Sequence, residues 1–413
     1  MGLVSDISID CGSSSSHTDA GNRTWVGDTD FVSTGLSSKI ESTGTADYLT
    51  TLRYFPTGET NCYANIPVDK GAKVLVRTRF YYGNYNEEYK PPRFDVVYDG
   101  KHRDTIHTTA MDVDLSEAIY VSESGNISVC FVRTFMNEHP FVSTIEVRSL
   151  DASMYTDLGP KEGYILQRRF AYGRKELVRS PFDPYDRFWV EPSPDFPVTV
   201  LTSAAVSINT TKSENRPPEV VLRTSWSEKD MTFYDIKLPF TGVTFYLVMY
   251  FSEPISLSSD QKRSFYVYYD KKQVGSSLVV PPFGAVTQTS LRDVMMSSNP
   301  YLEFKATPDS NLPPLINALE LYVVSNSDGR GGGGNGTKPT NTTGGDGGGS
   351  SGSGGGKSDS AGKQEGEQSS NLRLPLGISL PLLALGTGWG AWKYCTKRNR
   401  GSASKLPILF FCV

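Results

Sequence analysis

The chain has 413 residues and a formal net charge of −4 at pH 7, and 38% of its residues are hydrophobic and 11% aromatic. This length and apolar content are sufficient for two ordinary domains with packed cores, and they exclude wholesale disorder. No block of basic residues lies outside the far C-terminal region, so we exclude nucleic acid as a partner.

The N-terminal residues, from Met1 to Asp6, carry neither the basic stretch nor the apolar core of a secretory signal peptide. Five N-x-Ser/Thr sequons nevertheless occur along the chain, at Asn22, Asn126, Asn209, Asn335 and Asn341. Five acceptor sites favour N-glycosylation in the secretory pathway. We therefore expect that the signal peptide is missing from this sequence, rather than that the chain stays in the cytosol.

Three cysteines lie in the part of the chain that is expected to fold, namely Cys11, Cys62 and Cys130. The other two, Cys395 and Cys412, lie near the C-terminus, and the sequence contains no C-x-x-C pair. A thiolate metal site or a redox pair is therefore not expected. The three candidates allow one disulfide in any of three pairings and leave one thiol over.

Short segments in which apolar residues alternate with polar ones recur through the first 326 residues. They are rich in Val, Tyr, Phe and Thr, and the clearest are Val74–Phe80, Phe94–Tyr98, Ser143–Val147, Phe245–Phe251, Phe265–Tyr269 and Ala318–Val323. Turn residues separate them and no long amphipathic helix interrupts them. The pattern predicts an all-β fold of the sandwich type.

An internal repeat organises these strands. Phe80 and Phe94 enclose a loop, and Phe251 and Phe265 enclose another at an offset of 171 residues. The segments FDVVYDGK and FYVYYDKK follow the two loops and are alike. Self-similarity at a constant offset indicates a duplicated structural unit.

The repeat predicts two tandem domains. PFVSTIEV from Pro140 is echoed by PLINALEL from Pro314. We expect the first domain to span residues 7–150 and the second to span 163–326, with a linker at 151–162. Trp25, Trp189, Phe94 and Phe265 are expected to lie in their cores.

A glycine-rich segment follows, at residues 327–371. Residues 329–356 contain 15 of the 39 glycines of the chain, a composition that predicts a disordered stalk. The stretch from Leu374 to Trp392 then has 19 residues and no charge. It predicts a transmembrane helix at 372–393.

The orientation of this helix follows from the residues after it, which include Lys393, Lys397, Arg398 and Arg400. A basic cluster on that side places the short tail, residues 394–413, in the cytoplasm. We therefore expect a single-pass type I protein of the plasma membrane whose N-terminal domains are extracellular.

Several motifs resemble those of the malectin-like domains of plant receptor-like kinases, in particular the ectodomains that occur with leucine-rich repeats. They are IDCG at Ile9–Gly12, RYFPTGETNCY at Arg53–Tyr63, DPYDRFW at Asp183–Trp189 and LPPLINALELYVV at Leu312–Val324. The resemblance covers roughly residues 7–325. Leucine-rich repeats and kinase motifs are absent from the sequence.

The resemblance implies recognition of carbohydrate or of secreted peptides at the cell surface. In animal malectin, the loop that corresponds to the one between Phe80 and Phe94 carries an aromatic pair that holds sugar. By this resemblance, Asn84 and Tyr85 fall on the positions of that pair. Aromatic faces stack on sugars, so we predict a ligand site at Tyr85, Asn84, Tyr81, Tyr82 and Tyr89. The alternative for each tyrosine is packing at the sandwich edge. In the second copy the paired positions are Ile255 and Ser256, so sugar stacking is not expected there.

We therefore expect a cell-surface binding module that acts with a kinase-bearing partner, as a co-receptor or as a decoy. The alternative is a structural or adhesive cell-wall protein. No catalytic set is recognisable, and the four histidines, at positions 17, 102, 107 and 139, lack metal-ligand spacing. Neither an enzymatic activity nor a cofactor is predicted.

Overall fold

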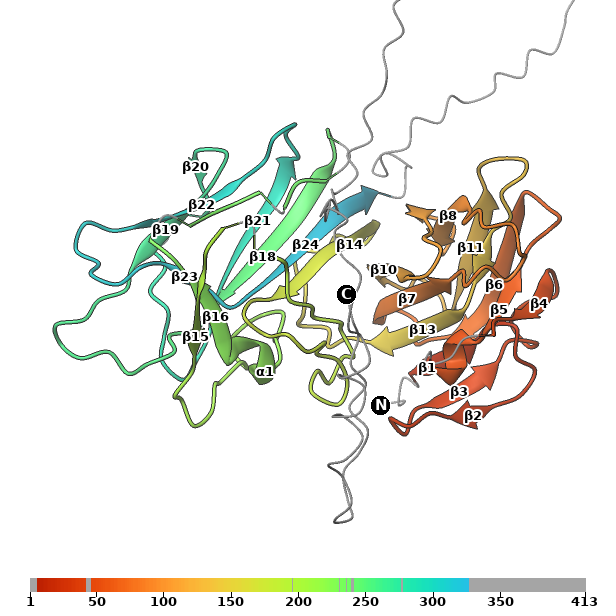
Figure 1. The fold of residues 1–413 in the computed structure, drawn as a ribbon, viewed down its shortest axis with the longest axis horizontal. Helices are drawn as coiled ribbons and strands as arrows, with labels where there is room; N and C mark the ends of the chain where they lie inside the picture. Colours follow the sequence, from red (N-terminus) through yellow and green to blue (C-terminus); the bar gives the residue numbers. More distant parts are fainter. Residues whose placement is uncertain are drawn as a thin grey trace, which may run out of the picture. The chain divides into compact units, whose positions relative to one another are not determined.

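β-strands make up nearly all of the regular structure. The computed structural model describes residues 6–326 apart from 42–45, 195, 230, 235, 239–240 and 276–277. The only helical turns in this part of the chain are η1 (Asp47–Leu49) and α1 (Glu219–Leu222). The prediction of an all-β fold is therefore confirmed. Strands β1 to β13 form a first lobe and strands β14 to β24 a second lobe (Figure 1).

The first lobe packs a large sheet against smaller ones. The large sheet contains β1 (Ile7–Asp10), β2 (His17–Thr18), β3 (Thr24–Gly27), β7 (Lys73–Tyr81), β10 (Val113–Val121) and β13 (Thr144–Ser149). A four-stranded sheet contains β6 (Thr60–Pro67), β8 (Arg93–Tyr98), β9 (His102–His107) and β11 (Asn126–Arg133). A small sheet contains β4 (Leu36–Lys39), β5 (Thr51–Tyr54) and β12 (Phe141–Val142).

The second lobe repeats this arrangement. Its part of the large sheet contains β14 (Glu162–Ala171), β18 (Thr244–Phe251), β21 (Thr287–Met295) and β24 (Ala318–Asn326). Its four-stranded sheet contains β17 (Met231–Phe233), β19 (Phe265–Tyr269), β20 (Lys272–Gln273) and β22 (Leu302–Ala306). Its small sheet contains β15 (Thr199–Thr202), β16 (Thr224–Ser227) and β23 (Leu315–Ile316).

The strand orders of the two lobes correspond. The order β1-β13-β7-β10 in the first lobe matches β14-β24-β18-β21 in the second, and β6-β11-β8-β9 matches β17-β22-β19-β20. The Phe80 and Phe94 rings meet edge to face at 5.4 Å, and those of Phe251 and Phe265 meet at 5.5 Å with the same interplanar angle of 77°. The repeat predicted from these four residues is thus a duplicated core.

The two lobes share one continuous sheet. Strand β10 of the first lobe pairs antiparallel with β14 of the second, so ten strands form a single sheet. The connection between the lobes packs closely, since Met154 and Tyr155 are fully buried. The domain boundaries at residues 150 and 163 remain predictions, because the sheet runs across them.

The four aromatic residues expected in the cores, Trp25, Trp189, Phe94 and Phe265, are all fully buried. The interior of each sandwich is built from inward-facing apolar residues of opposing sheets, as the period-two alternation requires. Close packing of such large rings contributes a major share of the apolar burial that stabilises a sandwich.

One disulfide, Cys62–Cys130, joins β6 to β11. The two cysteines are directly opposite each other in the antiparallel pair, with Cα atoms 4.0 Å apart. Cys11 is a free thiol and is fully buried. The structure thereby selects one of the three pairings that the sequence left open.

A network of buried ion pairs lies where the lobes meet. Arg77 on β7 donates to Glu117 on β10 at 2.6 Å, and Arg169 on β14 donates to the other oxygen of Glu117, also at 2.6 Å. Arg169 also bonds Glu320 on β24 at 2.9 Å. These side chains are fully or almost fully buried, so the lobes are joined by charged contacts as well as by the sheet.

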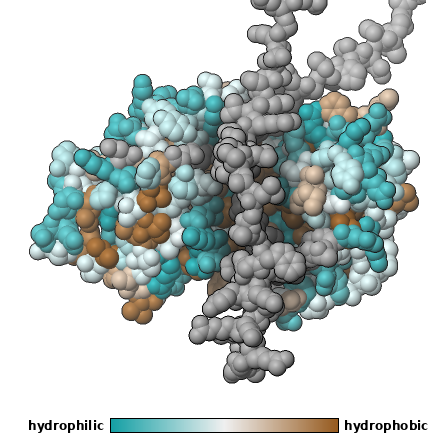
Figure 2. All heavy atoms as spheres, in the orientation of Figure 1, coloured by the Kyte–Doolittle hydropathy of each residue, from teal (hydrophilic) through white to brown (hydrophobic). Residues whose placement is uncertain are grey.

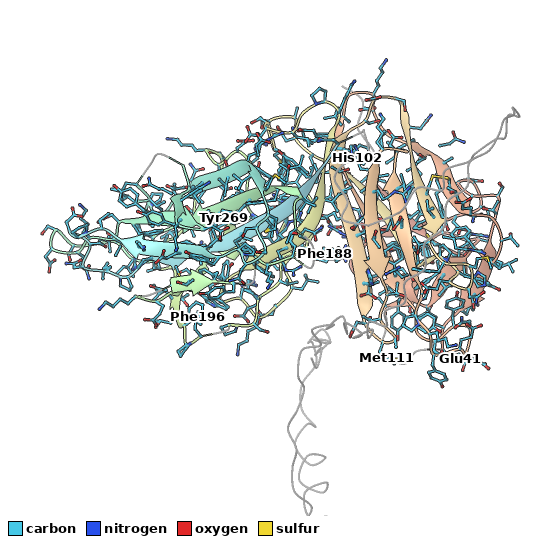
Figure 3. All side chains as sticks on the ribbon, turned by 90° about the horizontal axis from the view of Figure 1, so that it is seen from above. Glu41, His102, Met111, Phe188, Phe196 and Tyr269 are labelled. Carbon is cyan, nitrogen blue, oxygen red and sulfur yellow. A yellow bond between two sulfur atoms is a disulfide. The ribbon has the colours of Figure 1, made fainter. Side chains whose placement is uncertain are left out.

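The network continues around Glu146 and Asp186. Arg148 lies 2.7 Å from Glu146, and Arg179 of the second lobe lies 2.9 Å from Asp186. The guanidinium of Arg77 lies over the ring of Phe188 at 3.7 Å, and Figure 3 shows Phe188 between the two lobes. Buried charges of this kind require their partners, because an unpaired charge in a dry interior is costly.

His102 on β9 is buried against the second lobe, where its ring would clash with any side chain at Gly163. Burial, and to a lesser degree the charge of Lys101, lowers the pKa of His102 to about 4. An unfolded histidine has a pKa of about 6.5. Protonation is therefore easier in the unfolded chain, and acid destabilises the fold.

We expect this histidine to lower the free energy of unfolding by about 3 kcal/mol as the pH falls from about 6.5 to about 4. The loss should be absent above pH 7, where His102 is neutral in both states. The measurement compares denaturant unfolding of the wild type and His102→Gln across this range. Burial raises the pKa values of Asp10 and Asp104 to about 6, so these two groups stabilise the fold as the pH falls. Their contribution is the same in both proteins and cancels in the comparison. Parallel pH curves for the two proteins would disprove the assignment.

The predicted stalk, transmembrane helix and tail, residues 327–413, lie outside the described residues. Within the described residues, no helix has the length and hydrophobicity needed to span a bilayer.

Candidate functional site

The candidate site is the loop between β7 and β8, which contains four of the five residues predicted to bind ligand; the fifth, Tyr81, is the last residue of β7. Tyr81 and Tyr82 are buried, so they support the loop from inside. Tyr85 is partly buried, and its ring contacts those of Tyr54 and Phe141 at 5.2 and 5.6 Å. Tyr89 is 79% exposed. The loop thus presents one aromatic ring to solvent and a second at the edge of the core.

Hydrogen bonds within the loop hold this arrangement. Asn84 does not present its amide to the pocket described below; its Oδ1 accepts from the backbone N–H of Tyr89 at 2.8 Å. The hydroxyl of Tyr82 accepts from the N–H of Lys90 at 3.1 Å and donates to Asn86. Asn84 and Tyr82 are therefore positioning residues for the exposed end of the loop.

The backbone of the loop is strained. Asn84, Glu87 and Tyr89 have φ angles of 55°, 59° and 54°, in the left-handed region that residues other than glycine seldom adopt. Such conformations cost free energy and persist where the surrounding structure enforces them, often at ligand sites.

A pocket of about 500 Å³ lies beside the loop. Tyr85, Asn86, Glu88 and Tyr89 line one side, and the other is lined by the β11–β12 loop with Asn137, Glu138 and His139. The pocket combines aromatic rings with amide, carboxylate and imidazole groups. This combination suits a ligand with both C–H faces and hydroxyl groups.

Two polar groups of the β11–β12 loop shape the pocket. Glu138 accepts a hydrogen bond from the N–H of Arg93, which ties the loop to the start of β8. His139 has a buried Nδ1 without a hydrogen-bond partner among the described residues.

On the β7–β8 side of the pocket, burial raises the pKa of Tyr85 well above its usual value, so its hydroxyl stays protonated. The site thus offers both donors and acceptors.

Sequence reasoning did not assign Asn137, Glu138 and His139 to this site. The one sequence feature that points to them is their position directly before PFVSTIEV, the segment from Pro140 that recurs as PLINALEL from Pro314. The exposed Met136, at 86%, lies in the same loop.

The three predicted glycosylation sites that the structure describes, Asn22, Asn126 and Asn209, are all exposed and so accessible to modification. Asn335 and Asn341 lie outside the described residues. Across residues 6–326, apart from the gaps given above, no three His, Cys, Asp or Glu side chains are grouped as metal ligands would be.

Comparison with known proteins is consistent with this fold. The profile of the Malectin-like domain family matches residues 9–324. The chain is 62% identical over 455 aligned positions to an uncharacterized protein of Arabidopsis thaliana, covering 98% of this chain and 91% of that protein. It is 32% identical over 350 positions to a probable leucine-rich-repeat receptor-like serine/threonine-protein kinase of Arabidopsis thaliana, covering 78% of this chain and 38% of the kinase. The chain therefore spans well under half the length of that relative.

Solved structures show the same fold at low sequence identity. The ANXUR1 extracellular domain from Arabidopsis thaliana matches with a TM-score of 0.65 and 15% identity, over 78% of this chain and 97% of that one. A chain of the complex of the plant peptide RALF23 with FER and LLG2 matches with a TM-score of 0.61 and 16% identity, over 78% of this chain and 96% of that one.

Proposed function

Since the chain belongs to the malectin-like family, we propose that it is a receptor-like ectodomain that binds an extracellular ligand and acts with a kinase-bearing partner. The relatives that carry a kinase support the receptor role, and the complex that contains RALF23 is a precedent for a peptide ligand in this fold. The transmembrane helix predicted at 372–393 would hold the chain on the plasma membrane, with the exposed sequons glycosylated.

For the first lobe we propose that the ligand is carbohydrate. The observation that carries this proposal is the pocket in which the exposed Tyr89 and the partly buried Tyr85 face polar side chains of two loops. A sugar ring stacked on Tyr89 would place its hydroxyl groups near Asn86, Asn137 and His139, which can donate or accept hydrogen bonds.

The test is binding of the full chain to an array of plant cell-wall oligosaccharides, for the wild type and Tyr89→Ala. We expect Tyr89→Ala to weaken binding by about tenfold, because a stacked ring contributes on the order of 1 kcal/mol. Tyr89 is 79% exposed, so its loss should leave the fold intact.

The matched control is Tyr234→Ala, which removes a 53% exposed tyrosine of the second lobe and should leave binding unchanged. If no oligosaccharide binds, or if both variants bind as the wild type does, the carbohydrate proposal for this pocket fails.

A further inference from the structure

A second pocket, of about 550 Å³, lies in the second lobe. The loop after β18 and the loop before β23 line it, as do residues of β15 and β16. Its apolar lining includes Leu201, Ile255, Leu312 and Pro314. Figure 2 shows apolar groups at the surface of the half that this lobe forms.

The residues that line this second pocket do not support the sugar stacking proposed for the first pocket. No aromatic ring is among the described residues that line it, so a sugar has no face on which to stack. Arg263 is 4% exposed and is neutralised by Glu253, whose carboxylate accepts its Nε–H at 2.8 Å. Glu228 and Lys229 add one charge of each sign at the pocket. A nearly neutral apolar pocket is complementary to an uncharged apolar group.

An open strand edge lies beside this pocket. In the described part of the chain, β15 pairs with β16 alone, and it forms one edge of its sheet. Directly after β15, the N–H of Ser203 donates to the carbonyl of Arg223 at 2.8 Å. Ser203 and Arg223 are therefore a hydrogen-bonded pair of the β15–β16 ladder. By the alternation of an antiparallel ladder, Thr199 and Leu201 bond to β16, and the backbone groups of Val200 and Thr202 face outward.

We propose that the edge of β15 and its pocket bind an extended segment of a partner polypeptide. The segment adds a strand to β15 through the outward backbone groups at Val200 and Thr202. One of its apolar side chains enters the pocket lined by Leu201 and Ile255. Backbone pairing gives such a contact its affinity and the pocket gives it specificity. The inference deepens the proposed extracellular ligand-binding function and rests on it.

The test is binding of the full chain to an array of random linear decapeptides. We expect enriched peptides to share an apolar residue flanked by strand-forming residues. Val200→Pro removes an outward N–H without touching a β15–β16 hydrogen bond, and proline is tolerated at an edge of this kind. It should weaken peptide binding by at least tenfold.

The matched control is Ser37→Pro in β4, the corresponding edge strand of the first lobe. The N–H of Ile40 donates to the carbonyl of Thr50 at 2.8 Å, so the amide of Ser37 also faces outward in the ladder with β5. This variant carries the same backbone change outside the second pocket and should bind the peptides as the wild type does.

A second variant tests the pocket without altering the backbone. Ile255 is 39% exposed, so Ile255→Asp should fold normally and yet weaken peptide binding by at least tenfold. Enrichment of no peptide, or equal binding by Val200→Pro and the wild type, would overturn the inference. Oligosaccharide binding at Tyr89 is measured separately, so failure here can be told from failure of the carbohydrate proposal.

Discussion

Replacing Glu146 with Gln is expected to lower the free energy of unfolding by about 3–5 kcal/mol. Glu146 is fully buried, with Arg148 at 2.7 Å, Arg79 at 3.0 Å and Arg179 at 3.4 Å. Glutamine keeps the shape of the side chain and removes its charge. Arg79 would then lose its carboxylate partner, and Arg148 and Arg179 would have to share Asp186, so positive charge in the dry interior would be less well compensated. Denaturant unfolding of the full chain measures the change.

The dependence of this effect on pH has a definite sign. The surrounding arginines hold the pKa of Glu146 well below its usual range, in spite of its burial. The stabilisation is therefore present in full above the ordinary pKa of glutamate and is lost as the pH falls toward the folded-state pKa. The difference between the wild type and Glu146→Gln should accordingly shrink in acid.

The control is Glu123→Gln. Glu123 pairs with Lys101 at 2.6 Å, but its side chain is 55% exposed, and exposed pairs contribute little. We expect no resolvable change in stability. If Glu146→Gln were as stable as the wild type, the buried network would not be what holds the lobes together.

The duplicated core could be predicted because its signals are local. Phe80 and Phe94 recur as Phe251 and Phe265 at one offset, and alternating residues around them form strands in both copies. A residue that faces inward in one copy must face inward in the other if the fold is the same. The pairs of rings in both lobes bear this out.

The charged junction could not be predicted from such patterns. Arg77 and Arg79 alternate with apolar residues on β7, a pattern typical of a strand with one face in solvent. Both are nevertheless buried, because Phe188 and Asp186 of the second lobe cover that face. The covering segment lies about a hundred residues away in the sequence, and no local periodicity reports such a contact.

The tyrosine loop was predicted as a unit, but its members divide by exposure. Tyr82 is fully buried and Tyr89 is 79% exposed. The division depends on the left-handed residues Asn84 and Glu87, which turn the backbone between them. Residues other than glycine carry no clear sequence signal for this conformation, so composition alone could not assign the exposed ring.

The second large effect is expected from removal of the disulfide by the double change Cys62→Ala and Cys130→Ala. The bridge joins residues 68 positions apart. A crosslink that closes a loop of this length restricts the unfolded chain and contributes about 4 kcal/mol. Denaturant unfolding in oxidising buffer should show a loss of this size.

Adding a reductant distinguishes the contribution of the disulfide bond to stability from that of the packing of the two cysteine side chains. It should lower the stability of the wild type to near that of the double variant and leave the variant itself unchanged. Among the described residues, strand β6 is the edge of its four-stranded sheet and pairs with β11 alone. The bridge therefore strengthens the attachment of this edge strand. The corresponding pair β17–β22 of the second lobe has no cysteine. If reductant did not affect the wild type, the bridge would not contribute to its stability.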